Sequence, residues 1–183
     1  MKRIFSAFIF CAVLTGQGGL PAAAETEQCP SAGPGASFCA GSDFSRVDTG
    51  GIDGLSYWMD DAGYLSKVVV EAGMDASVNQ AVVESHILSM VTAQAGEVGR
   101  AFEFRDLKSA RSDGADFGTI SYSLAKAGRA KPILHSYVLV GEIVVQVISQ
   151  AARKGTARDA AALLQAHRRA IDAIELKPSG ETL

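Results

Sequence analysis

Cys29 and Cys39 are the two residues of this sequence whose chemistry is easiest to predict. The chain between them is rich in Ser, Gly, Ala and Pro, so it can fold back on itself. The pair lacks the C-x-x-C spacing of redox motifs, and no histidine lies nearby to complete a metal site. In an oxidising compartment such a pair usually forms a structural disulfide. We predict that bond, which would stabilise the fold by roughly 2–3 kcal/mol.

The three histidines are the next candidates, because imidazole can bind a metal ion or transfer a proton. His86, His135 and His167 show neither H-x-x-x-H spacing nor a carboxylate at a metal-ligand spacing. We therefore expect half-buried histidines with one hydrogen bond each; the alternative is a metal or proton-transfer site. His135, Tyr137 and Gln146 share the mixed face of a predicted strand pair and are weak polar candidates for binding. No metal ion and no cofactor is predicted.

Serine chemistry needs a nucleophile beside its base, and the local sequence offers no such pair. The chain contains no G-x-S-x-G elbow. Ser85 and His86 are neighbours on a predicted helix, and His135 and Ser136 are neighbours on a predicted strand, so the members of each pair point apart. The sequence therefore predicts no catalytic residue.

Aromatic and arginine side chains are candidates for a surface that contacts a partner. Tyr57, Trp58 and Tyr64 fall in an early hairpin, where at least one ring must face inward. Arg168 and Arg169 fall on the outer side of the last predicted helix. The alternatives are core aromatic residues and a solvated, basic helix face.

The first residues of the chain have the three parts of a secretory signal peptide. Lys2 and Arg3 precede an apolar run over residues 4–14, and Ala22, Ala23 and Ala24 supply a small-residue cleavage site. The apolar run is much shorter than the roughly 20 residues of a membrane-spanning helix. We predict removal of residues 1–24, no membrane span, and a periplasmic or secreted protein.

The charge of the chain limits its partners. The formal net charge is −3, with dispersed basic residues, which argues against nucleic acid as a partner. The expected partners are another envelope protein or a small ligand. The oligomeric state is left open.

The remaining chain reads as one α+β domain over residues 51–177. An irregular, disulfide-tied entry segment over residues 25–50 precedes this domain, and a frayed tail over residues 178–183 follows it. A hairpin is predicted from strands at residues 55–59 and 64–71 with an Asp/Gly turn. Ser77 and Gln80 form a capping box for a helix over residues 78 to about 95, whose buried stripe is Val83, Ile87, Met90 and Val91.

The second half is predicted to form a meander and a closing helix. Phe102, Phe104 and Leu107 alternate with polar residues as in a strand, and three strands follow at residues 118–126, 132–140 and 143–150. A two-residue turn at Gly141 places Val140 opposite Ile143, so one face of this hairpin is apolar and the other mixed. A final helix has Thr156 as its cap and Pro178 and Gly180 after its end. Its stripe is Leu163, Leu164, His167, Ile171 and Ile174.

This order of elements resembles the PsbP-like superfamily, which includes a photosystem extrinsic subunit, a nuclear-import factor and bacterial DcrB-type envelope proteins. The matching stretches are residues 67–90, KVVVEAGMDASVNQAVVESHILSM, and residues 114–176, GADFGTISYSLAKAGRAKPILHSYVLVGEIVVQVISQAARKGTARDAAALLQAHRRAIDAIEL. The resemblance implies an antiparallel sheet of about five to six strands with helices packed on both faces. It also implies binding or assembly more often than catalysis, and the group has no shared catalytic set to carry over.

The predicted role is that of an exported, non-catalytic binding or accessory protein of the bacterial cell envelope. One alternative is a periplasmic, hydrolase-like enzyme whose residues converge only in three dimensions. The other is a secreted inhibitor or immunity-type protein. A pocket with titratable groups of shifted pKa would favour the enzyme, whereas an exposed apolar patch would favour a protein-binding module.

Overall fold

The structure is a computed structural model that describes residues 29–98, 105–106, 109–110, 116–126, 129–152 and 159–177. Several predicted features lie outside these residues. They are the signal peptide, the strand around Phe102, Phe104 and Leu107, the cap at Thr156, and the tail at residues 178–183.

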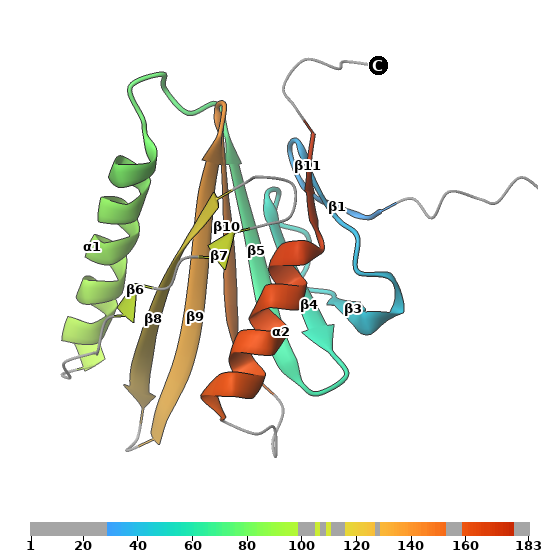
Figure 1. Cartoon of the computed structure of the whole chain (residues 1–183), viewed down its shortest axis with the longest axis vertical. Coiled ribbons are helices and arrows are strands. Elements are labelled where there is room, and N and C mark those ends of the chain that lie inside the picture. Colours follow the sequence, from blue (N-terminus) through green and yellow to red (C-terminus); the bar gives the residue numbers. More distant parts are fainter. Residues whose placement is uncertain are drawn as a thin grey trace, which may run out of the picture.

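The described strands form a main antiparallel sheet in the spatial order β3-β4-β5-β10-β9-β8 (Figure 1). Their bounds are β3 Phe44–Val47, β4 Leu55–Asp60, β5 Tyr64–Ala72, β10 Ile143–Ala151, β9 Arg129–Val140 and β8 Asp116–Lys126. Two short strands, β6 (Arg105–Asp106) and β7 (Ser109–Ala110), both pair with β8. The predicted antiparallel sheet is therefore confirmed.

Two tight turns set the register of this sheet. Gly63 has φ 90° and donates a hydrogen bond to the carbonyl of Asp60, which closes the β4–β5 hairpin. Gly141 has φ 60°, and the β9–β10 hairpin pairs Val140 with Ile143 as predicted. Only glycine adopts such backbone angles at little cost, so each turn falls where a glycine stands.

The entry segment is not irregular, which corrects our prediction. It contains β1 (Ser31–Gly33), β2 (Ala36–Phe38), a 3-10 turn at Gly41–Asp43, and strand β3 of the main sheet. β2 lies between β1 and β11 (Ile174–Leu176) in a small antiparallel sheet. β3 pairs with β4, whereas β2 pairs with β1 and also with β11 from the other end of the chain. The turn-rich sequence did not indicate the β2–β11 pairing, because local patterns do not show distant partners.

Helix α1 (Gln80–Val98) begins two residues after the predicted start at residue 78, so Ser77 and Gln80 do not form its capping box. The side chain of Asn79, not of Ser77, accepts the free N–H of Val82. The side chain of Gln80 instead bonds the backbone of β9, at the carbonyl of Tyr137 and the N–H of Leu139. Three members of the predicted stripe are buried, namely Val83, Ile87 and Val91, while Met90 is exposed.

Helix α2 (Ala160–Asp172) is capped by Asp159, whose carboxylate accepts the N–H of Ala161. It ends before Ile174, which belongs to β11, so the predicted helix was too long. Leu163 and Ile171 are buried as predicted, but Leu164 is half-buried.

The prediction of half-buried histidines with one hydrogen bond each is wrong for most of them. His86 is exposed, His135 is buried with one hydrogen bond, and His167 is buried with two.

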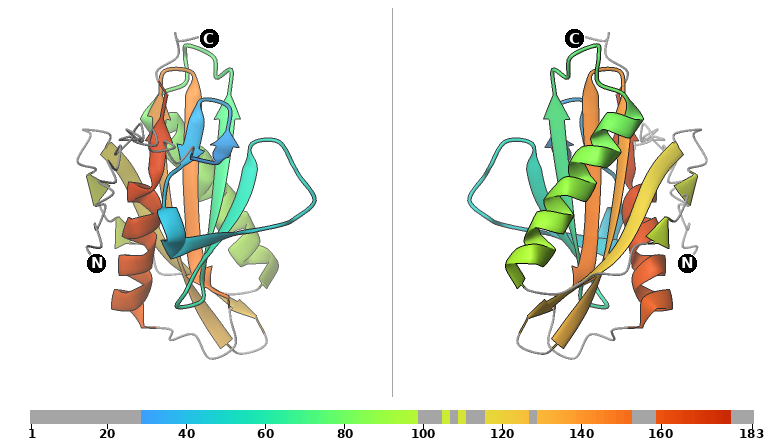
Figure 2. Two further views of the ribbon diagram at one scale, coloured as in Figure 1. Left: turned by 90° about the vertical axis from the view of Figure 1, so that its right-hand side faces the viewer. Right: turned by 90° about the vertical axis from the view of Figure 1, so that its left-hand side faces the viewer.

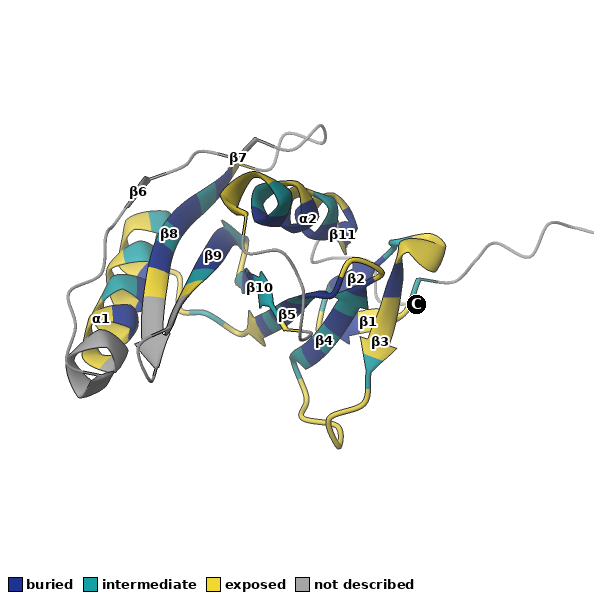
Figure 3. Ribbon diagram, turned by 90° about the horizontal axis from the view of Figure 1, so that it is seen from below, coloured by how far each residue is buried: buried dark blue, intermediate teal, exposed yellow. Residues whose placement is uncertain are grey.

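The helices lie on opposite faces of the main sheet, in an α/β/α arrangement (Figures 1 and 2). α1 packs on β8 and β9, where Ile87 belongs to one buried cluster with Ile120, Tyr137 and Val144. α2 and the small sheet cover the other face, where Ile171 and Phe38 join Val68, Val145 and Val147 in one core. Buried residues therefore lie on both sides of the central strands (Figure 3). No helix in the described parts of the chain is long and apolar enough to cross a membrane.

Candidate functional site

A groove of about 430 Å³ lies on the sheet face that carries α1. It is lined by side chains of α1 and of the strands from β4 to β8, so nearly the whole width of the sheet contributes to it. α1 crosses this face of the sheet in the right-hand view of Figure 2.

The apolar part of the groove comes from side chains that alternate along the strands and from one side of the helix. These residues are Leu65, Val69, Met90, Val91, Ile133 and Ile148. In β5 they alternate with Val68 and Val70, which are buried on the other face of the sheet. Strand alternation therefore exposes a second apolar surface, which the small sheet and α2 do not cover.

Three groove residues form a hydrogen-bond chain across neighbouring strands. The Gln146 side-chain amide donates to Glu71 Oε1 at 3.4 Å, and Gln146 Oε1 lies 2.9 Å from His135 Nε2. A carboxylate only accepts hydrogen bonds, so Gln146 must present its N–H to Glu71 and its carbonyl to His135. His135 therefore carries its proton on Nε2 and has a bare lone pair on Nδ1.

His135 is neutral and nearly enclosed, with 2 % of its surface exposed. Burial is the main cause that lowers the pKa of His135 to about 4. The hydrogen bond to Gln146 raises this pKa by a smaller amount, and the charge of Lys67 lowers it further. Nδ1 of His135 is buried and has no hydrogen-bond partner among the described residues. Such an acceptor carries an uncompensated desolvation cost.

Two tyrosines also line the groove. Tyr122 lies beside His135, with ring centroids 6.4 Å apart, and burial raises its pKa to about 12, so it keeps its proton at neutral pH. Tyr57 is half-buried on the open part of the face. Lys67, Glu71 and Gln150 complete the polar lining.

Tyr137, the third weak polar candidate, does not line this groove. It is 3 % exposed and packs beneath α1 with Ile87 and Val144. Its ring covers Gly118 of the neighbouring strand, its register partner, and a Cβ at that position would overlap the ring. The role of Tyr137 is therefore packing.

The predicted aromatic partner surface is wrong for two of its three rings. Trp58 and Tyr64 are 4 % and 3 % exposed. Trp58 stacks on Phe38 at 4.3 Å between ring centroids, and its indole N–H donates to Ser56 Oγ. Alternation along β4 directs Trp58 to the α2 side and leaves Tyr57 on the groove side.

The two arginines of that predicted surface differ from each other. Arg169 donates to Asp60 Oδ2 at 2.7 Å, and Asp60 is 2 % exposed, so Arg169 is engaged within the protein. The other oxygen of Asp60 accepts the N–H of Tyr64. Arg168 is exposed, as predicted for the outer side of the helix.

A second polar chain lies on the opposite face, beneath α2, and sequence reasoning missed it. Thr119 Oγ1 bonds Ser136 Oγ at 2.6 Å, Ser136 Oγ bonds His167 Nε2 at 2.7 Å, and His167 Nδ1 bonds Ser149 Oγ at 2.8 Å. Ser149 also bonds Ser66 at 2.8 Å. No local motif could reveal it, because each member comes from a different element.

Ser136 and His167 have the spacing of a nucleophile and its base, but both are 0 % exposed. Burial lowers the pKa of His167 to about 3, with a smaller lowering from His135. Neither residue lines the groove, and both are enclosed beneath α2, so we assign this pair to holding α2 on the sheet.

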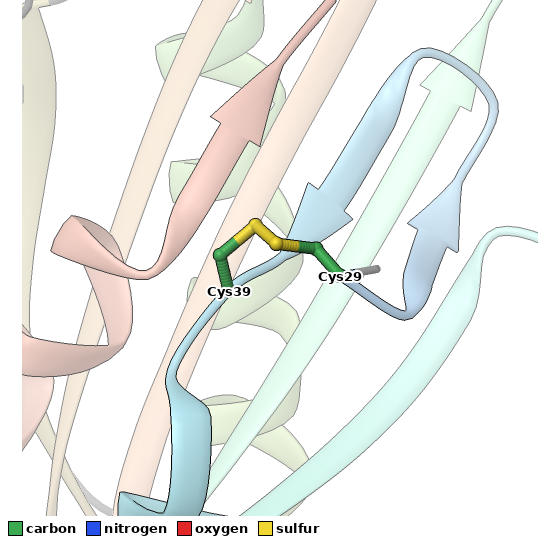
Figure 4. The surroundings of a disulfide bond; sticks show 2 residues. All are labelled: Cys29 and Cys39. Carbon is green, nitrogen blue, oxygen red and sulfur yellow. A yellow bond between two sulfur atoms is a disulfide. The ribbon is translucent and has the colours of Figure 1, made fainter. Parts of the chain in front are cut away.

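The predicted disulfide between Cys29 and Cys39 is confirmed, with Cα atoms 4.8 Å apart. It joins the chain before β1 to the chain after β2 (Figure 4). Glu175 lies close enough to complete a metal-binding group, but the bonded sulfurs offer no thiolate.

A second hollow of about 560 Å³ lies beside this disulfide and is lined by Phe38, Phe44, Trp58 and Arg46 among others. Its rings contact one another, and the Arg46 guanidinium lies 5.7 Å from the Trp58 ring centroid. These groups pack against one another, whereas the groove holds an acceptor, Nδ1 of His135, that no described residue bonds. The groove is therefore the better candidate site.

Solved structures similar to this chain share its fold. The solution structure of the cyanobacterial PsbP (CyanoP) from Synechocystis sp. PCC 6803 has a TM-score of 0.56 at 13 % identity, covering 78 % of this chain and 86 % of that one. A crystal structure from Bacteroides thetaiotaomicron VPI-5482 has a TM-score of 0.53 at 14 % identity, covering 84 % of this chain and 49 % of the other, about half its length.

LpqN, involved in cell envelope biogenesis of Mycobacterium tuberculosis, has a TM-score of 0.44 at 14 % identity, covering 78 % of this chain and 83 % of LpqN. No family model and no curated protein matches the sequence. The CyanoP structure confirms the predicted PsbP-like fold.

Proposed function

The chain has the PsbP-like α+β fold, and we propose that it uses this fold as an exported, non-catalytic binding protein of the bacterial cell envelope. The groove between α1 and the sheet is its ligand site. The observation that carries this proposal is the combination, in one groove, of an apolar lining with the enclosed Nδ1 of His135, which no described residue bonds. Ligand sites are typically apolar hollows with few, well-placed polar groups.

The absence of catalysis is supported by the burial of both serine–histidine contacts among the described residues, Ser136–His167 and His167–Ser149. Ser136 and His167 are fully enclosed beneath α2, on the face opposite the groove.

Within the groove, burial shifts two pKa values, that of His135 to about 4 and that of Tyr122 to about 12, which is a feature expected of an enzyme. Both groups are therefore neutral at neutral pH, and the described lining contains no serine, threonine or cysteine for the imidazole to activate. The imidazole is held instead by Gln146, which also bonds the Glu71 carboxylate.

Export is supported by the signal-peptide pattern at the start of the chain and by the disulfide. Disulfides persist in the periplasm and outside the cell and are rare in the cytosol. An envelope binding protein meets its ligand in that oxidising compartment.

The ligand site is tested with the full chain, expressed with its leader and recovered from the periplasm. After gel filtration the protein is denatured, and the released small molecules are identified by mass spectrometry. We expect the wild-type protein to release a compound that Val69→Trp does not, because Val69 lies in the groove beside Gln146 and an indole would fill it.

Ile52→Trp is the matched control, because Ile52 is 61 % exposed and does not line the groove. This variant should keep the compound, and both variants should unfold near the wild-type temperature. Equal release from wild type and from folded Val69→Trp would contradict the groove as a ligand site.

The same preparation tests export. We expect mass spectrometry to find Glu25 as the first residue of the recovered protein, because cleavage after Ala24 fits the small-residue rule. Membrane-bound protein that begins at Met1 would overturn the signal-peptide interpretation.

A further inference from the structure

We propose that the groove binds a neutral, largely apolar small molecule that donates a hydrogen bond to Nδ1 of His135. This inference rests on the proposed function of the groove and names the chemical class of its ligand. Hydroxyl, indole N–H and amide N–H groups on an apolar body belong to this class.

The donor requirement follows from the hydrogen-bond chain. Glu71 can only accept, so it orients the Gln146 amide, and the Gln146 carbonyl then holds the proton of His135 on Nε2. A ligand that offers only lone pairs would meet the lone pair of Nδ1 and be repelled. A ligand that donates would satisfy an acceptor that is buried and unpartnered among the described residues.

The neutrality of the ligand follows from the charges around the groove. The charged residues among its described lining are Lys67 and Glu71, one of each sign. A full charge on the ligand would therefore be attracted by one and repelled by the other while losing its hydration. The six apolar lining side chains favour an apolar body, and burial keeps His135 uncharged at neutral pH.

Access to Nδ1 requires a lining side chain to move, because this atom is screened from solvent. Met90 projects from α1 into the groove lining and is 39 % exposed. Its unbranched thioether changes rotamer at low cost, which suits a site that adapts to the shape of its ligand.

The test compares 2-naphthol with 2-methoxynaphthalene, two probes of similar shape of which only the first can donate a hydrogen bond. Binding to the exported, disulfide-bonded protein is measured by titration calorimetry at pH 7. We expect 2-naphthol to bind about five- to tenfold tighter, the effect of one hydrogen bond of ordinary net strength. The folded Val69→Trp variant should bind neither probe.

Nitrogen NMR of the wild-type protein locates the contact without any substitution. In the free protein, Nδ1 of His135 should resonate as an unprotonated ring nitrogen that accepts no hydrogen bond. 2-Naphthol should shift this resonance upfield, and 2-methoxynaphthalene should leave it in place.

The variant His135→Phe keeps a ring in place but removes the acceptor, so the two probes should bind it with equal affinity. His86→Phe is the matched control, because His86 is exposed on α1 and outside the groove lining, and it should keep the preference.

Equal affinities for wild type, with both probes lost in Val69→Trp, would overturn the donor inference and leave the groove as a binding site. If neither probe binds although periplasmic protein releases a ligand that Val69→Trp lacks, the ligand class is wrong and the proposed function stands. If both experiments are negative, both proposals fail.

Discussion

Two buried histidines of this protein differ in how their ring nitrogens are satisfied. His167 bonds Ser136 through one nitrogen and Ser149 through the other, beneath α2. His135 bonds Gln146 through Nε2 and leaves Nδ1 without a partner among the described residues. The fully bonded histidine therefore contributes to stability, and the partly bonded one marks the candidate ligand site.

Acid should destabilise the protein through these histidines. Their folded-state pKa values, about 3 for His167 and about 4 for His135, are below the ordinary value of 6.5. Between pH 6.5 and 4 the unfolded chain binds protons that the folded protein excludes. The free energy of unfolding should therefore fall as pH drops, by up to about 1.4 kcal/mol per pH unit for each histidine.

Urea unfolding at pH 7, 6 and 5 measures this slope. His167→Gln should make it shallower, because one excluded proton is gone, while exposed His86→Gln should not change it. An unchanged slope in His167→Gln would show that His167 does not cause the acid sensitivity.

Arg169 and Arg168 are neighbours with different roles. Arg169→Ala removes the ion-pair partner of Asp60, which is 2 % exposed, and should lower stability by about 1–2 kcal/mol, because Arg169 itself is partly solvated. Arg168→Ala is the control and should change the denaturation midpoint little, because its side chain is exposed. Equal midpoints for the two variants would contradict a structural role for the Arg169–Asp60 pair.

Helix α2 is the element that closes one face of the sheet. Its buried side chains Leu163, Ala166, His167, Ala170 and Ile171 recur at helical spacing. An isolated helix of this length is marginal in water, so packing on the sheet provides most of its stability.

Shortening single side chains of this helix to alanine should show which of its large apolar residues lie in the core. Ile171→Ala should destabilise the protein by about 2–5 kcal/mol, because Ile171 is 2 % exposed among Val145, Val147 and Ile174. Leu164→Ala should cost about 1 kcal/mol, because Leu164 is half-buried at the edge of a smaller cluster. Denaturation midpoints compare the two, and a larger loss for Leu164→Ala would contradict this packing.

At the scale of the whole molecule, the two faces of the sheet differ in how they are closed. The α2 face is closed by a helix, a small sheet and a disulfide-tied hairpin, and its polar chain is bonded from end to end. The α1 face keeps a groove with an acceptor that no described residue satisfies. We therefore propose that stability and binding belong to opposite sides of one sheet.

Removal of the disulfide tests this separation. Cys29→Ser/Cys39→Ser should lower the free energy of unfolding by about 2–3 kcal/mol, because the unfolded chain gains conformational freedom. Binding of 2-naphthol to the folded variant should not change, because the disulfide lies outside the groove lining. Chemical denaturation and calorimetry measure the two effects, and a coupled loss of affinity would argue against separate functions for the two faces.

Local patterns in the sequence predicted most of the elements correctly. The β4–β5 and β9–β10 hairpins and the register of Val140 with Ile143 follow from turn glycines and alternating side chains, which act between residues close in sequence. The disulfide followed from two cysteines in a predicted export context. The mixed face with His135 and Gln146 was also visible, because alternation along one strand needs no distant partner.

Pairings between distant segments were decided by the tertiary structure. β11 gives β2 a second partner from the other end of the chain, and β3 pairs with β4. These pairings form strands within a segment whose sequence predicts an irregular structure. Ser136 meets His167, and Glu71 meets Gln146, only because α2 packs on β9 and β10 lies beside β5. Local sequence determines which face a side chain takes, whereas the side chain it meets depends on how non-local strands and helices pack.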